Sequence, residues 1–122
     1  MFTVEFYETE DGERPVRDFI AALDPKMRAK VVGSLRILAE KGNQLREPDT
    51  KPLGDGIFEL RSIFGSNIAR ALFFFYVGKK IIVTNGFIKK RQKTPKNEIE
   101  LAKKRRADYL QRQEKEKGEK KK

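Results

Sequence analysis

Hydrophobic and polar residues alternate at the start of the chain and then change to helical spacing. Residues 2–7 alternate and are rich in strand-forming side chains, which predicts a first β-strand. Apolar residues then recur at helical spacing in two stretches, one beginning at Pro15 and the next at Pro25. Asp24 is a favoured N-cap for the second helix, and Gly42 is a residue type that ends helices. Because the connection between the two helices is short, we expect them to form a hairpin.

Three further strands are predicted in the middle of the chain, after a loop rich in turn-forming residues over 43–56. They are the β-like runs IFELRSI, IARALFFFYV and KKIIVTNGFI. The gaps between these runs are too short for a parallel crossover, so neighbouring strands are expected to be antiparallel. Thr94 and Pro95 then mark the start of a last helix.

The predicted element order is β-α-α-β-β-β-α. This order gives an α+β fold, in which two N-terminal helices pack on a mostly antiparallel sheet and one helix follows at the C-terminus. A chain of 122 residues, of which 38% are hydrophobic, has enough apolar side chains for one core. We assign residues 1–110 to this domain. Residues 111–122 are polar and low in complexity, and they predict a basic, disordered tail.

Several classes of protein are excluded by what the chain lacks. It has no cysteine and no histidine, which excludes disulfides, zinc sites built on these ligands, and Ser-His or Cys-His nucleophile pairs. We therefore expect no metal and no cofactor. No apolar run is long enough to cross a bilayer, and the N-terminus does not have the pattern of a secretory signal. We expect a cytoplasmic protein without membrane association.

Charge is unevenly distributed along the chain, whose formal net charge is +10. Residues 1–60 hold 9 Lys and Arg against 12 Asp and Glu, a net charge of −3. Residues 61–122 hold 19 against 6, a net charge of +13. Such a concentration of positive charge favours a partner that carries phosphate groups.

Two arginines lie within the apolar strand-like runs. Arg70 shares one face of its predicted strand with Leu72 and Phe74, and Arg61 shares a face with Glu59. A charged side chain in such a strand is costly unless it is paired or faces an open cleft. Two interpretations follow, an ion pair across the hairpin to Glu59 or a binding site for phosphate.

A basic turn follows the last predicted strand, and its charged residues are Lys89, Lys90, Arg91 and Lys93. Antiparallel pairing brings this turn near Arg70, and we expect Lys51 to border the same edge of the sheet. Phe87 offers a ring on which an RNA base can stack, although a Phe is more commonly a core residue. The turn is equally open to a plainer interpretation as a solvated surface loop.

These residue types are compatible with RNA cleavage. Arginine binds phosphate through two hydrogen bonds and stabilises the charge that develops during phosphoryl transfer. A lysine crowded by other cations has a lowered pKa and can act as a base. The ribose 2′-hydroxyl can serve as the nucleophile, so a metal-independent endoribonuclease can be built from Arg and Lys.

The segments DGIFELR, IARALFFFYV and GFIKKRQKTPKNEIELAKKRRADY together resemble the RelE/HigB superfamily of type II toxins, in particular its phage-derived HigB-like branch. The resemblance covers residues 1–110 and implies a RelE-like fold and cleavage of mRNA on the translating ribosome. It also implies that Arg61 and Arg70 contact the scissile phosphate. Lys90 and Lys93 match basic positions of the family, one of which transfers protons or binds phosphate, and the resemblance does not decide between them.

The resemblance also implies partners. Toxins of this kind are bound by an antitoxin, here a HigA-like helix-turn-helix protein, and reach operator DNA only through it. Two alternatives stay open. The same basic face can bind RNA or the ribosome without cutting, or the protein can serve mainly to hold a partner.

Overall fold

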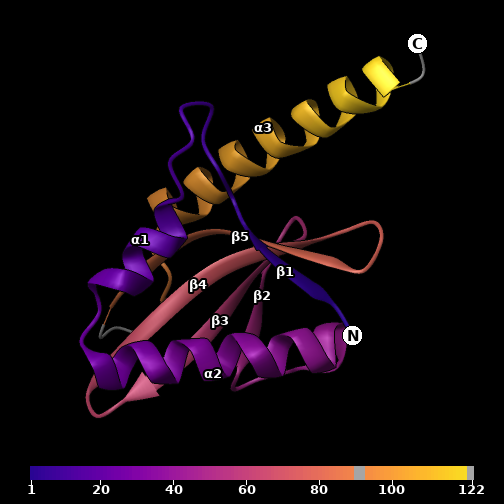
Figure 1. Ribbon diagram of the computed structural model, residues 1–122. Helices are drawn as coiled ribbons and strands as arrows, with labels where there is room; N and C mark the ends of the chain where they lie inside the picture. The colour runs from indigo at the N-terminus through magenta and orange to yellow at the C-terminus, as the bar shows by residue number, and fades with distance from the viewer. Residues whose placement is uncertain (90–92, 121–122) are drawn as a thin grey trace.

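The computed structural model describes residues 1–89 and 93–120. Figure 1 shows a twisted sheet with helices on both of its faces. The elements, in chain order, are β1 (Thr3–Phe6), α1 (Pro15–Ala22), α2 (Pro25–Lys41), the 3-10 turn η1 (Gly42–Gln44), β2 (Thr50–Gly54), β3 (Ile57–Phe64), β4 (Asn67–Tyr76), β5 (Lys80–Ile88) and α3 (Lys96–Lys120).

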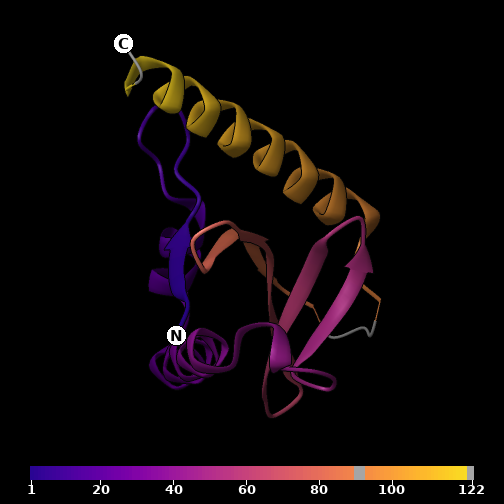
Figure 2. The same cartoon turned by 90° about the vertical axis from the view of Figure 1, so that its right-hand side faces the viewer.

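The described strands form one five-stranded sheet in the order β1-β5-β4-β3-β2. β1 runs parallel to β5, and the three other pairings are antiparallel. α1 and α2 lie on one face of the sheet and α3 lies on the other (Figure 2). The expected α+β class and the mostly antiparallel sheet are therefore confirmed.

The predicted element order is wrong at one strand, because the structure has the order β-α-α-β-β-β-β-α. The additional strand is β2, which lies within the segment predicted to be a loop. Pro52 and Gly54 are residue types that disfavour strands, and for this reason the sequence predicts a loop where β2 lies. Proline is tolerated here because β2 is the edge strand, and the pairing with β3 shifts register between Pro52 and Gly54.

The two N-terminal helices begin and end where the sequence predicts. The Asp24 side chain accepts hydrogen bonds from the backbone N–H groups of Lys26 and Met27, at 3.1 and 3.0 Å, and so caps α2. Gly42 ends α2 with a positive φ of 52°, a conformation that suits glycine. The buried side chains of both helices form one core with β3, β4 and β5; from the helices they are Val16, Ile20, Met27, Val31, Leu35 and Leu38.

A second, smaller core lies under α3 on the opposite face. Ala102 and Tyr109 of α3 pack there against Leu72 and Phe74 of β4 and Ile82 of β5. This core fixes α3 across the sheet, and the contact of Glu98 with Asn85 places the first turn of the helix over β5.

α3 continues to Lys120, so residues 111–120 are helical where the sequence predicts a disordered tail. The segment consists mainly of Glu, Lys, Gln and Arg, which are strong helix formers. An ion pair between Arg112 and Asp108, one turn apart at 2.7 Å, also supports the helix. None of the helices in the described part of the chain is long and apolar enough to cross a membrane.

Candidate functional site

The register of the sheet brings the candidate residues of three strands together. Arg61 of β3 lies opposite Arg70 of β4, and Arg70 lies opposite Phe87 of β5. In the adjacent row, Lys51 of β2 lies opposite Glu59. All these positions belong to the face that α3 covers. The predicted proximity of Arg70 to the end of β5 is therefore confirmed.

Glu59 is the centre of this row, and its side chain is completely buried. Its Oε1 atom accepts hydrogen bonds from Arg61 Nε at 2.8 Å and from Arg70 Nη1 at 2.9 Å. The hydroxyl of Thr94, just before α3, donates to the other oxygen. The ion pair to Glu59, one of the two interpretations of these arginines, is therefore confirmed.

The two arginines differ in their access to solvent. The Arg70 side chain is 0% exposed, whereas the Arg61 side chain is 20% exposed. Arg70 thus lies behind Glu59, and Arg61 is the member of the cluster that reaches the surface. Two guanidinium groups share one carboxylate, so the cluster keeps one net positive charge, which Arg61 presents outward.

A second polar contact ties β5 to α3. The Asn85 side-chain amide donates to the Glu98 carboxylate at 2.9 Å and to the Glu98 backbone carbonyl at 3.2 Å. The Thr84 hydroxyl donates to the side-chain oxygen of Asn85 at 2.6 Å. Neither this contact nor the role of Thr94 was predicted from the sequence. For the cluster around Arg61 and Arg70, the sequence offers one sign, which is Glu59, a carboxylate in an otherwise apolar strand.

The predicted basic residues surround this cluster at the surface. Lys51 is half-buried on β2, and Lys89 and Lys93 are exposed on either side of the connection between β5 and α3. The Lys89 backbone N–H donates to the carbonyl of Ile68 at 3.0 Å, which holds the start of this connection against β4. Lys90 and Arg91 lie outside the described residues.

Apolar side chains lie beside these charges. Phe87 is half-buried and packs against the core under α3, so the core interpretation describes most of its contacts. Ile63 lies two residues beyond Arg61 on the same face and is 52% exposed. The surface around Arg61 therefore combines cations with an apolar patch. Within residues 1–89 and 93–120, no group of three or more acidic side chains is arranged to hold a metal ion.

Comparison with known proteins identifies the family. A search of curated proteins found no match. The family model described as "Phage derived protein Gp49-like (DUF891)" matches residues 18–107, which are 90 of the 122 residues. The matched segment contains Glu59, both arginines and the start of α3. The chain therefore belongs to the phage-derived Gp49-like family, which is part of the RelE/HigB-like toxin superfamily.

Proposed function

We propose that the chain is the toxin of a type II toxin-antitoxin system and cleaves mRNA on the ribosome without a metal. The Gp49-like family is associated with toxins of the RelE type, which supports this proposal. The observation that carries it is the cluster of Arg61, Glu59 and Arg70, which presents one positive charge among exposed lysines.

In the proposed reaction, the ribose 2′-hydroxyl attacks the adjacent phosphorus. A bond forms between O2′ and phosphorus, and the bond from phosphorus to O5′ breaks. The 2′-hydroxyl proton passes to a base, and O5′ takes up a proton. The products are a 2′,3′-cyclic phosphate and a free 5′-hydroxyl.

Each protein group has a separate task in this reaction. Arg61 donates to the non-bridging phosphate oxygens and stabilises their developing charge. Glu59 holds the Nε atom of Arg61, and Arg70 holds Glu59, so Arg70 is a positioning residue. Lys93 or Lys90 transfers protons.

The remaining basic residues bind the message on either side of the cleaved bond. Lys51, Lys89 and Arg91 contact flanking phosphates. Phe87, together with the apolar surface at Ile63, supports an RNA base. These contacts fix which phosphate of the message lies at Arg61, and none of them requires a metal ion.

The toxin family implies an antitoxin partner. We propose that this partner is a HigA-like helix-turn-helix protein and that the toxin reaches operator DNA only through it. We place the pair in the cytoplasm.

The test is a reconstituted translation reaction with a defined message, in which new 5′ ends are mapped by primer extension. The wild-type protein is expected to cut only translated message. Arg61→Ala is expected to lower the rate of cutting by roughly a hundredfold or more, as for the loss of one donor to a developing oxyanion. Arg36→Ala, an exposed position on α2 across the sheet, is the matched control and is expected to cut like the wild type.

One observation favours a second candidate function. Arg70 is wholly buried and paired with Glu59, so one arginine of the cluster, not two, reaches the surface. A site of this kind can bind RNA or the ribosome without cutting. The absence of new 5′ ends, combined with salt-sensitive binding to ribosomes, identifies this function. Equal cutting by Arg61→Ala and the wild type overturns the proposed role of Arg61.

A further inference from the structure

The sheet has one open edge, at β1. The backbone N–H groups of Thr3 and Tyr7 donate to the carbonyls of Lys79 and Val83, both at 2.9 Å. Backbone groups alternate in direction along a strand, so those of Val4 and Phe6 point away from β5. Among the described elements, β5 is the only strand that pairs with β1, and β1 lies at the rim of the sheet (Figure 1). The N–H group of Phe2, which points the same way, donates to the carbonyl of Ala39 in α2 at 2.7 Å, so Val4 and Phe6 are the positions that remain for another strand.

The opposite edge of the sheet is protected. Its strand, β2, contains Pro52, which has no N–H to donate, and its register shifts between Pro52 and Gly54. Proline and bulges are common means by which proteins prevent pairing at an edge. β1 contains no proline and no bulge. Its residues Val4, Glu5 and Phe6 are each half-buried, so they are partly accessible to a partner.

An apolar groove of about 330 Å³ lies beside β1 on the face of α1 and α2. Arg17 and Arg36 border it. The side chains that form its floor are all apolar, and they are Val4, Phe6, Ile20, Val32, Leu35 and Ala39. An aliphatic side chain placed beside β1 on this face would be removed from water.

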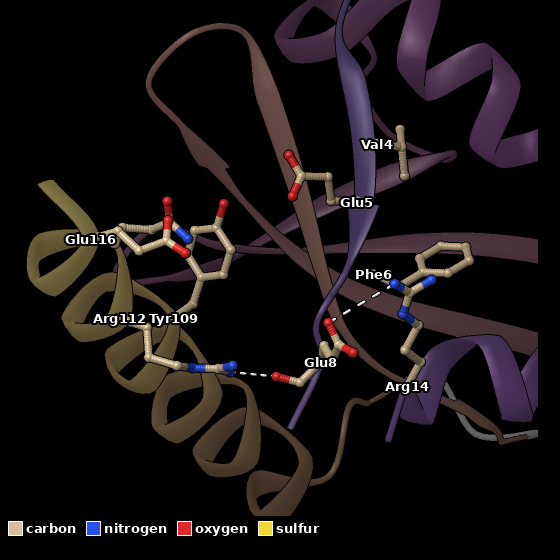
Figure 3. Close-up of a pocket in the computed structure, with 9 residues that line it drawn as sticks. Val4, Glu5, Phe6, Glu8, Arg14, Tyr109, Arg112 and Glu116 are labelled. Atoms are coloured by element: carbon tan, nitrogen blue, oxygen red, sulfur yellow. Dashed lines mark hydrogen bonds and ion pairs between the residues drawn. The ribbon is translucent and has the colours of Figure 1, made fainter. Parts of the chain in front are cut away.

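An acidic cavity of about 480 Å³ lies beside β1 on the other face, between β1 and α3 (Figure 3). Glu5, Glu8 and Glu116 contribute carboxylates to it. Most of these charges are already paired. Glu5 lies 3.1 Å from Lys80, and Glu8 lies 3.9 Å from Arg14. Arg112 lies 2.7 Å from Asp108. Glu116 has no ion pair among the described residues, so the cavity keeps the charge of one carboxylate in a chain whose net charge is +10.

Tyr109 supplies the second polar feature of this cavity. Its side chain is buried, and its hydroxyl makes no hydrogen bond within the described part of the chain. Burial, followed by the nearby charges of Glu5 and Glu116, raises the pKa of Tyr109 to about 12. The hydroxyl therefore stays neutral, and its oxygen can accept a hydrogen bond from a cation that enters beside the carboxylates.

We propose that β1 is the docking edge for an extended segment of a partner protein in which apolar and basic residues alternate. Side chains of an added strand project alternately to the two faces of the sheet. The apolar residues would enter the groove beside α2, and the lysines or arginines would enter the acidic cavity. The inference rests on the proposed function in one respect, which is that the partner is the antitoxin.

The test uses a fluorescent seven-residue peptide that alternates valine and lysine. Fluorescence anisotropy measures its affinity, and amide hydrogen exchange followed by NMR locates it. Binding is expected to slow exchange at the N–H groups of Val4 and Phe6, which point outward. The same peptide with glutamate in place of lysine is not expected to bind.

Charge variants separate the cavity from the overall charge. Glu116→Lys is expected to weaken the affinity for the valine-lysine peptide at least tenfold. Glu10→Lys makes the same change of charge at an exposed turn and is expected to leave the affinity unchanged. Because a chain of net charge +10 repels a basic peptide, any binding must come from a local acidic site.

Three outcomes overturn the proposal: no binding of the basic peptide, equal weakening by both lysine variants, or binding without protection at Val4 and Phe6. The result of the peptide-binding test can be distinguished from the result of the cleavage assay. Glu116 lies on a later turn of α3, away from the Arg61 cluster, so Glu116→Lys is expected to cut RNA like the wild type. Peptide binding without RNA cleavage would retain the docking edge and reject the nuclease.

Discussion

Glu59 determines where positive charge appears on the face under α3. A carboxylate removed from water is costly unless it is paired and hydrogen-bonded. Glu59 meets this condition through Arg61, Arg70 and the Thr94 hydroxyl. The consequence at the surface is that Arg61 is held by its Nε atom while its side chain stays 20% exposed. One buried acid therefore orients the arginine that we propose to contact the phosphate.

The residue-scale prediction is a large loss of stability in Glu59→Gln. This change keeps the shape of the side chain but removes the negative charge that both arginines share. Breaking a buried ion pair in this way is expected to lower the free energy of unfolding by about 3–5 kcal/mol. Urea denaturation followed by circular dichroism measures it.

Glu100→Gln is the matched control for this variant. The Glu100 side chain is 63% exposed and lies 3.9 Å from Lys103, and exposed pairs of this kind contribute about 0–1 kcal/mol. A loss of stability in Glu59→Gln no larger than in Glu100→Gln would show that the buried cluster does not stabilise the fold.

At the scale of elements, the sequence predicts best where periodicity and capping agree. The helices α1 and α2 are predicted correctly from their prolines and from Asp24, and β3, β4 and β5 from their strand-forming runs. β2 is missed because its pairing with β3 overrides the local preferences of Pro52 and Gly54. The arginines of the candidate site are found from the sequence. Their common partner is proposed only as one of two interpretations, because a charge in a strand fits either an ion pair or a ligand site.

Glycine replacements provide a prediction at the same scale. A Cβ atom added at Gly86 of β5 would lie 2.5 Å from the ring of Phe19, which shows how closely α1 packs on the sheet. Gly86→Ala is therefore expected to lower the free energy of unfolding by roughly 1–3 kcal/mol through overpacking.

Gly33→Ala is the same chemical change with the opposite expected sign. A Cβ atom added at Gly33 of α2 meets no atom within 4 Å, and alanine favours a helix interior over glycine by about 1 kcal/mol. Thermal denaturation of both variants measures the two effects. A gain of stability in Gly86→Ala would contradict the packing of α1 against β5, and a loss in Gly33→Ala would contradict the open space beside α2.

At the scale of the whole molecule, charge of opposite sign is separated in space. Arg61, Lys51, Lys89 and Lys93 gather near the start of α3, and the acids of the cavity lie along β1, toward the other end of that helix. A single chain can thus present one surface to an RNA and another to a protein. This arrangement allows an antitoxin to dock at β1 without occupying the RNA surface.

The dependence of RNA binding on salt tests which cations form that surface. Each phosphate contacted on a single strand contributes about −0.7 to the slope of log affinity against log salt concentration, so four contacts give roughly −3. The double variant Lys51→Ala with Lys89→Ala is expected to reduce this slope by about 1.4, because two contacts are lost. Lys115→Ala with Lys117→Ala removes the same charge from the end of α3 and is expected to leave the slope unchanged. Filter binding of a single-stranded RNA at several salt concentrations measures the slope for both double variants. An equal reduction of the slope in the two would show that the C-terminal end of α3 also binds RNA.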